Sequence, residues 1–274
     1  MTLTECKQTL EEIGLQPTKS LGQNFLIDQN ILRIVVETAE VRPGDTVWEV
    51  GAGLGALTGA LLQEGAHVMA VEKDARSTTF LRRRFRDDKN LTLIHGDALT
   101  IQFPPPAPGY KLVANLPYSI STAILKRFVE SEQPPRKMVL MLQREVGERL
   151  AAKPGTPDYG VLTVFTQVNY RVSLRHIVKR RCFYPAPDVD SVIVALDYAP
   201  HPLLDRTDRA RFADHVRTGF AQRRKQFAKL LTHSGLAREQ IEQAFQALKF
   251  PLDVRAEKLS VEQFLLLARE LSNG

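Results

Sequence analysis

The stretch Glu49-Val50-Gly51-Ala52-Gly53-Leu54-Gly55 lies between the apolar run Thr46–Val50 and a helical pattern that begins at Ala56. Glycines at a strand-to-helix turn let the backbone approach a ligand closely. The first N–H groups of the following helix then point into the same site. A unit of this kind is typical of an α/β sheet that binds its ligand at the carboxyl ends of the strands. The stretch therefore predicts both the fold class and the place of a cofactor.

Outward from this stretch, short apolar runs alternate with helical spacing. Helices are predicted to begin at Ala56, Asp74, Ser119 and Arg144, and strands are predicted over Thr46–Val50, His67–Val71, Leu91–His95, Lys111–Ala114, Lys137–Leu142 and Asp190–Tyr198. Asp28 is typical of the N-cap of an earlier helix whose apolar face is Ile31, Leu32, Val35 and Val36. The alternation predicts a parallel, Rossmann-like sheet with helices on both faces.

The strand signals stop beyond Pro200-His201-Pro202. The remaining sequence has helical spacing over residues 207–221, 224–233, 238–248 and 260–272, with Ser260 as an N-cap. We therefore expect two domains: residues 1–200, which contain the sheet, and residues 201–274, which form a small all-α domain.

Composition restricts the class of protein. The 274 residues carry a net charge of +6, which suggests a polyanionic partner. Two cysteines, Cys6 and Cys182, predict neither a disulfide framework nor a zinc site, and the six histidines lack metal-ligand spacing. The N-terminus does not resemble a signal peptide, and no apolar run is long enough to span a bilayer. We expect a cytoplasmic protein without a metal.

Acidic residues mark the ends of three successive predicted strands. Glu49 precedes the first glycine, Glu72 ends the second strand, and Asp97 follows the third. A carboxylate repels a pyrophosphate and tolerates a cationic sulfonium or amino group. This pattern favours S-adenosylmethionine as the cofactor. The spacing of Gly51, Gly53 and Ala56 also meets the loose dinucleotide fingerprint, so an NAD-dependent enzyme remains an alternative from the loop alone.

The turn Asn115-Leu116-Pro117-Tyr118 follows a buried strand. The Asn115 side-chain oxygen and the Leu116 carbonyl can each accept one hydrogen of an exocyclic amino group. Pro117 restricts φ and has no N–H to compete. Tyr118 supplies a ring on which a base can stack. The turn therefore predicts a site for a flat nitrogen base, although a turn with a packed Tyr is the simpler alternative.

Six segments together resemble one family. They are Ser20-Leu21-Gly22-Gln23-Asn24-Phe25-Leu26, Glu49–Gly55, Glu72-Lys73-Asp74, Gly96-Asp97-Ala98, Asn115–Tyr118 and Phe183-Tyr184-Pro185-Ala186-Pro187-Asp188-Val189-Asp190-Ser191-Val192. In this order they are similar to the ribosomal RNA adenine N6,N6-dimethyltransferases, over almost the whole chain. Gly219–Gln226 and Asp158-Tyr159-Gly160 resemble the branch that modifies the small subunit.

The resemblance implies a class I S-adenosylmethionine-dependent methyltransferase sheet and a role for each site residue. Asn24 and Leu26 would close over the methionine end of the cofactor, and Gly51 would contact that end. Glu72 would bind the ribose hydroxyls, and Asp97 the adenine amino group. Asn115 would stand between cofactor and substrate, as both a cofactor-binding and a catalytic residue. The other expected site residues would hold the target adenine: Leu116, Pro117, Tyr118 and, opposite Tyr118, Phe183.

The activity implied is methylation of N6 in two adjacent adenosines of a hairpin near the 3′ end of small-subunit (16S) ribosomal RNA. The expected partner is this RNA or the immature small ribosomal subunit, bound by a monomer. Basic clusters at Arg82–Arg86, Lys179–Arg181 and Arg223–Lys225 fit phosphate binding. The alternatives are a large-subunit RNA dimethyltransferase of the macrolide-resistance type, a DNA methyltransferase, and a non-catalytic ribosome-assembly factor of the same fold.

Overall fold

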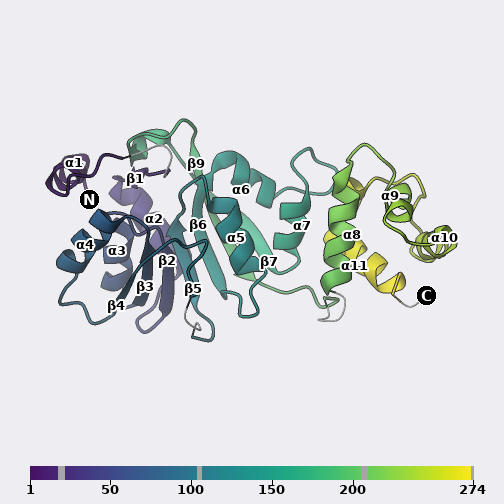
Figure 1. Cartoon of the computed structure of the whole chain (residues 1–274), viewed down its shortest axis with the longest axis horizontal. Helices are drawn as coiled ribbons and strands as arrows, with labels where there is room; N and C mark the ends of the chain where they lie inside the picture. Colours follow the sequence, from purple (N-terminus) through teal and green to yellow (C-terminus); the bar gives the residue numbers. More distant parts are fainter. Residues whose placement is uncertain (18–21, 104–106, 205–208, 273–274) are drawn as a thin grey trace. The chain divides into compact units, whose positions relative to one another are not determined.

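The structure, a computed structural model, describes residues 1–17, 22–103, 107–204 and 209–272 (Figure 1). Ser20 and Leu21, the first residues of one family segment, lie outside the described residues. The chain divides into two compact units. The first contains residues 1–147 and 172–198, and the second contains residues 148–171 and 199–274.

A seven-stranded sheet forms the centre of the first unit, with the strand order β4-β3-β2-β5-β6-β9-β7. The strands are β2 (Thr46–Val50), β3 (His67–Glu72), β4 (Leu91–His95), β5 (Lys111–Asn115), β6 (Lys137–Gln143), β7 (Tyr170–Val178) and β9 (Ser191–Tyr198). Strands β2 to β6 pair in parallel. The prediction of an α/β fold with a parallel sheet is confirmed for these five strands.

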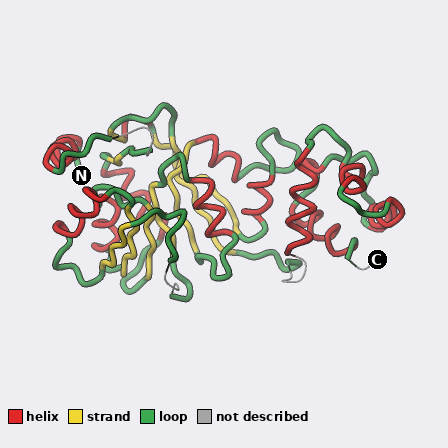
Figure 2. Tube along the Cα trace, in the orientation of Figure 1, coloured by secondary structure: helices red, strands yellow, loops and turns green. Residues whose placement is uncertain are grey.

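Helices cover both faces of this sheet, as predicted (Figure 2). Side chains of α2 (Gln29–Ala39), α3 (Ala56–Gln63) and α4 (Ala75–Arg84) share one core cluster with Val47, Val113 and other strand residues. On the opposite face, Trp48 of β2 contacts Phe128 of α5 (Ser121–Val129) edge to face. Successive side chains of a strand point to opposite faces of the sheet, so Val47 and Trp48 face different helices.

Local caps set where the helices begin. The Asp28 carboxylate accepts hydrogen bonds from the N–H groups of Asn30 (2.9 Å) and Ile31 (3.2 Å), so α2 begins where the sequence predicts. Asp74 does the same for α4 through the N–H of Ser77, at 2.8 Å. The first unit also contains α1 (Leu3–Glu12), and α6 (Arg144–Leu150) begins there, directly after β6.

The sequence analysis missed strand β7 and the direction of β9. β9 runs antiparallel to β6, with Gln143 opposite Ser191 and Lys137 opposite Asp197. Its first residue therefore lies at the edge where the parallel strands end. β7 is an edge strand whose middle residues are exposed, so its sequence lacks the apolar pattern of a buried strand.

A two-stranded antiparallel sheet joins two of the segments that carry the family resemblance. Strand β1 (Phe25–Leu26) pairs with β8 (Phe183–Tyr184), so that Leu26 lies opposite Phe183. These segments are far apart in the sequence, and their pairing brings the segment after residue 22 and the segment before β9 side by side.

The second unit consists mainly of helices. It contains α7 (Val161–Gln167), α8 (Arg209–Ala221), α9 (Phe227–His233), α10 (Arg238–Ala247) and α11 (Val261–Glu270), which share one apolar core. Ser260 caps α11, because its hydroxyl accepts a hydrogen bond from the N–H of Gln263. None of the helices within the described ranges has the length and apolar character that a membrane span requires.

The unit boundary differs from the boundary expected at residue 200. Residues 148–171 group with the C-terminal helices. The reason is their packing: Val164 and Val168 belong to the helical core, and the buried Tyr159 hydroxyl donates a hydrogen bond of 2.9 Å to the Leu259 carbonyl. These contacts join residues that are distant in the chain, so local sequence patterns do not predict them.

Candidate functional site

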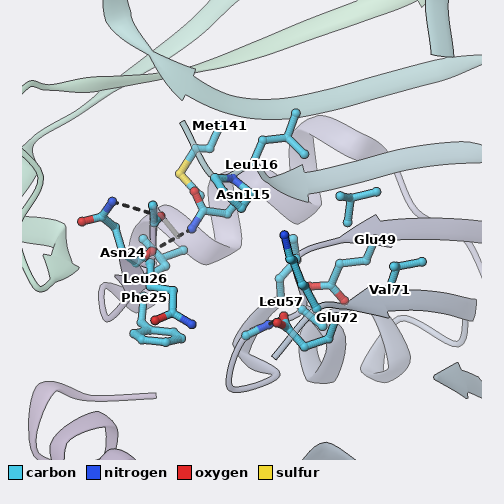
Figure 3. A pocket seen from close by; sticks show the side chains of 18 of the residues that line it. Asn24, Phe25, Leu26, Glu49, Leu57, Val71, Glu72, Asn115, Leu116 and Met141 are labelled. Atoms are coloured by element: carbon cyan, nitrogen blue, oxygen red, sulfur yellow. Dashed lines mark hydrogen bonds between the residues drawn. The ribbon is translucent and has the colours of Figure 1, made fainter. Parts of the chain in front are cut away.

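A cavity opens at the carboxyl ends of the parallel strands of the first unit (Figure 3). Loops after β2, β3, β4 and β5 contribute to its wall, as does the segment around β1. The predicted site residues that line it are Asn24, Leu26, Gly51, Glu72, Asp97, Asn115, Leu116, Pro117 and Tyr118. All of the predicted site residues except Phe183 are therefore brought together.

Two glycines allow three loops to meet at the cavity. Gly51 has φ +78°, and a Cβ there would lie 3.3 Å from Cδ of Pro117. Gly53 has φ +57°, and a Cβ there would lie 3.2 Å from the Phe25 ring. A larger residue at either position would be strained and would push apart the loops that form the cavity wall.

Glu72 is held at the end of β3 with its side chain only 7% exposed. One carboxylate oxygen accepts the N–H of Asp74 and the other accepts the N–H of Gly53, each at 2.8 Å. Burial raises the pKa of Glu72, and these two hydrogen bonds oppose that shift. Because each oxygen has further lone pairs, the oriented carboxylate can also accept the two hydroxyls of a ribose.

Glu49 lies deeper, with 1% of the residue exposed. The Thr58 hydroxyl donates a hydrogen bond of 2.6 Å to it. Burial raises the pKa of Glu49 to about 8, and the negative charge of Glu72 contributes to the increase. At neutral pH the protonated form therefore predominates until a cation is placed in the cavity, a property that the sequence analysis did not predict.

Asp97 has two partners in the structure. Its carboxylate accepts the N–H of Leu99 at 2.9 Å and pairs with the Lys73 ammonium at 2.9 Å. The hydrogen bond from Lys73 lowers the pKa of Asp97, so this carboxylate is ionised at neutral pH. Lys73 also lines the cavity. The sequence analysis did not predict this pair. The available signal was that Lys73 directly follows Glu72, at the end of a predicted strand.

The orientation of the Asn115 side chain follows from one hydrogen bond. Its amide nitrogen Nδ2 donates to the backbone carbonyl of Asn24 at 3.1 Å (Figure 3). Because an amide nitrogen only donates, this contact assigns the two ends of the amide and leaves Oδ1 as the acceptor for a ligand. Leu116 is buried beside it, and its N–H donates to the Met141 carbonyl at 3.3 Å.

Tyr118 and Phe183 have different surroundings. Tyr118 lines the cavity and is half-buried, and its hydroxyl lies 2.5 Å from Oγ of Ser191. Phe183 is only 3% exposed and belongs to the core cluster that also contains Leu26 and Ile193. Phe183 does not line the cavity itself, but Leu26, which lies opposite it in the β1–β8 pair, does.

Part of each basic cluster is engaged inside its own unit. Arg83 pairs with Glu12, Lys179 with Asp190 at 2.8 Å, and Arg223 with Glu257 at 3.2 Å. Arg86 also pairs with Asp87, at 3.0 Å. The other exposed members at the surface are Arg82, Arg180, Arg181, Arg224 and Lys225. The clusters therefore provide fewer cations for a polyanion than their sequence suggests.

Comparisons with known proteins agree with the geometry. The family model of the ribosomal RNA adenine dimethylases matches residues 14–273. The chain is 38% identical to the ribosomal RNA small subunit methyltransferase A of Geobacter metallireducens, over 94% of this chain and 96% of that protein. It is 37% identical to the protein of the same name from Clostridium acetobutylicum, over 97% of each.

Two solved structures share most of the fold. A dimethyladenosine transferase from Plasmodium falciparum superimposes with a TM-score of 0.80, at 26% identity, over 91% of this chain and 98% of that chain. The 23S rRNA methyltransferase ErmE superimposes with a TM-score of 0.72, at 30% identity, over 91% of this chain and 100% of that chain.

Proposed function

The chain belongs to the ribosomal RNA adenine dimethylase family, and on this premise we propose that it dimethylates N6 of two adjacent adenosines in a hairpin near the 3′ end of small-subunit (16S) ribosomal RNA. The product is N6-dimethyladenosine. The observation that carries the proposal is the Asn115 amide, oriented by the Asn24 carbonyl at a cavity that three acidic residues surround.

The residues of the cavity fit S-adenosylmethionine. Glu49, Glu72 and Asp97 all line it, and this set of acidic groups suits a cationic nucleoside. Glu72 would hold the ribose and Asp97 the adenine amino group, while Asn24, Leu26 and Gly51 would enclose the methionine end. When bound, S-adenosylmethionine supplies an electrophilic methyl group on a positively charged sulfonium.

The protein must activate the adenine N6, which is a poor nucleophile. The lone pair of the adenine N6 is delocalised into the ring. Asn115 Oδ1 and the Leu116 carbonyl accept its two hydrogens, which draws the nitrogen toward tetrahedral geometry and aims the lone pair out of the ring plane. The acceptors also stabilise the positive charge that grows on the nitrogen, so orientation and electrostatics act together.

The aromatic ring of Tyr118 offers a stacking surface for a base that has left its helix. Such a surface is compatible with a methylated amino group, because stacking acts on the face of the base and leaves its edge open. After each transfer the nitrogen loses its proton to water, since an alkylated anilinium-type nitrogen is strongly acidic. No histidine or cysteine is required as a base.

We further propose that the protein acts as a monomer on the immature small subunit, in the cytoplasm. The RNA-binding role is supported by the net charge of +6, of which +4 falls in residues 201–274, where 13 Lys and Arg stand against 9 Asp and Glu. Residues 201–274 are proposed to contribute RNA recognition, and residues 1–200 the cofactor and the chemistry.

The test supplies labelled S-adenosylmethionine with three acceptors: undermethylated small subunits, naked large-subunit RNA and duplex DNA. Label recovered as dimethyladenosine in small-subunit RNA, and lost in Asn115→Ala, is the expected result. Label only in large-subunit RNA would favour the activity named for ErmE, whose structure is also similar. Tight RNA binding without any label would favour a non-catalytic assembly factor.

A further inference from the structure

The hydroxyl of Tyr118 makes a contact outside the family segment that contains it. It lies 2.5 Å from Oγ of Ser191, and either hydroxyl can donate. Ser191 is fully buried and is the first residue of β9. The hydrogen bond therefore joins the turn after β5 to a strand 73 residues further along the chain.

The position of Ser191 is held by its neighbours on both sides. β9 pairs with β6, where Ser191 lies opposite Gln143. The preceding residue, Asp190, accepts hydrogen bonds on its carboxylate from the Lys179 ammonium (2.8 Å) and the Arg180 N–H (3.1 Å). Its carbonyl accepts the Arg144 N–H at 3.0 Å. Because these contacts hold the backbone around Ser191, its hydroxyl can restrain the position of the Tyr118 hydroxyl.

The other end of Tyr118 is also restrained. The Ser121 hydroxyl donates to the Tyr118 carbonyl at 3.1 Å. The backbone N of Tyr118 lies close to Gly22, where a Cβ would be 3.3 Å away. A tyrosine side chain has only two rotatable bonds before its hydroxyl. Because Cβ, the ring axis and the hydroxyl oxygen lie on one line, holding the backbone and the hydroxyl fixes the rotation about Cα–Cβ and, with it, the position of the ring.

We propose that Ser191 is a positioning residue that fixes the place of the Tyr118 ring, on which the target adenine stacks. The inference rests on the proposed function, because it requires a base in the cavity. Ser191 itself is buried and acts through Tyr118. A ring held in place presents N6 to Asn115 Oδ1 and the Leu116 carbonyl, whereas a ring released from Ser191 can rotate about Cα–Cβ and presents N6 in several positions.

The second methyl transfer depends more strongly on this restraint. A monomethylated amino group has only one hydrogen left to donate, so one of the two acceptors at Asn115 and Leu116 loses its partner. Stacking on Tyr118 then contributes a larger share of the orientation. Loss of the Ser191 contact is therefore expected to increase the fraction of monomethyl product.

Two substitutions remove the same hydrogen bond from opposite sides: Ser191→Ala and Tyr118→Phe. Each is expected to lower the single-turnover rate about threefold to tenfold, the factor that one neutral hydrogen bond provides. The double variant should be no slower than either single variant, since both changes break one contact. The matched control is Ser77→Ala, because Oγ of Ser77 is buried without a hydrogen-bond partner among the described residues.

A second readout is independent of methyl transfer. RNA that carries 2-aminopurine at the target adenosine reports stacking through its fluorescence when the protein binds. Ser191→Ala and Tyr118→Phe should change the fluorescence of the bound complex in the same way, and Ser77→Ala should leave it as in the wild type. Affinity for S-adenosylmethionine should be the same in all four proteins.

The results separate the two proposals. If the wild type is active and Ser191→Ala equals it in rate, product ratio and fluorescence, only the proposed role of Ser191 is overturned, and the proposed function stands. Losses that multiply in the double variant also overturn it, because Ser191 would then act apart from Tyr118. A wild type that methylates none of the three acceptors overturns the proposed function and, with it, the role of Ser191.

Discussion

Single residues at this site have their orientation or their charge set by a neighbour. The Asn24 carbonyl orients the Asn115 amide, and two backbone N–H groups orient the Glu72 carboxylate. Burial decides the protonation of Glu49, whereas Lys73 keeps Asp97 ionised. Two carboxyl groups of one cavity therefore differ in charge.

Asn115→Ala should lower the rate of methyl transfer by about 10²–10³, the loss seen when one preorganised hydrogen-bonding group of a transition state is removed. The expected change is in kcat, because the adenine still stacks on Tyr118. Single-turnover kinetics with saturating RNA measures it. A rate within about tenfold of the wild type would show that the Leu116 carbonyl alone is enough, against the proposed pair of acceptors.

Binding of S-adenosylmethionine should release a proton from Glu49. The pKa of this buried group is raised to about 8, and a cation in the cavity favours its ionised form. The association constant should therefore rise from about pH 6 to about pH 8 and level off above the raised pKa. Calorimetry in buffers of different ionisation enthalpy counts the protons released.

Glu49→Gln is the control for this pH dependence. The variant keeps a hydrogen-bond acceptor for Thr58 and removes the titrating group. It should bind with a flatter pH profile than the wild type. If both proteins show the same slope, the released proton comes from elsewhere, for example from the amino group of the cofactor itself.

At the scale of elements, the cavity depends on close approach between segments that are distant in the sequence. β1 pairs with β8, and the loop before α3 packs against the turn after β5. Gly55, the N-cap residue of α3, lies against α4, where an added Cβ would be 2.7 Å from both Leu81 and Phe85. Overpacking at this position would separate α3 from α4.

Gly55→Ala should lower the free energy of unfolding by about 1–3 kcal/mol more than Gly44→Ala, the usual cost of overpacking. Both glycines have positive φ, +77° and +83°, but a Cβ at Gly44 meets nothing within 4 Å. The pair therefore separates the clash from the backbone strain. Urea unfolding curves measure both variants, and equal losses would contradict the importance of the α3–α4 contact.

At the scale of the whole molecule, charge is the property that suits an RNA partner. The net charge is +6, and some cations of each basic cluster are engaged in ion pairs within their own unit. The exposed cations that remain can replace counterions on phosphates, and this exchange makes binding dependent on salt.

Arg224→Ala and Lys225→Ala should each weaken RNA binding and reduce the slope of log K against log salt by about 1. Both side chains are exposed in the second unit. Arg238→Ala is the matched control, since Arg238 is exposed but pairs with Glu242 at 2.7 Å. Filter binding at several salt concentrations gives the slopes, and an unchanged slope in Arg224→Ala would exclude this cluster from the RNA interface.

Much of the fold and most residues of the site could be predicted from local features of the sequence. Strands β2 to β6 and the starts of α2, α3 and α6 fall where apolar patterns and capping residues predict them. These signals are local, because side-chain periodicity and an N-cap depend on residues a few positions apart. The acidic residues after three strands also meet at one edge, since parallel strands all end there.

The other features follow from tertiary packing. Whether β9 runs parallel or antiparallel depends on its partner β6, and its direction brings Ser191 to the edge where β5 ends and into contact with Tyr118. The grouping of residues 148–171 with the C-terminal helices, the burial of Phe183 and the protonation of Glu49 follow in the same way. Each depends on contacts between residues far apart in the chain, and burial and charge are properties of that packing rather than of local sequence.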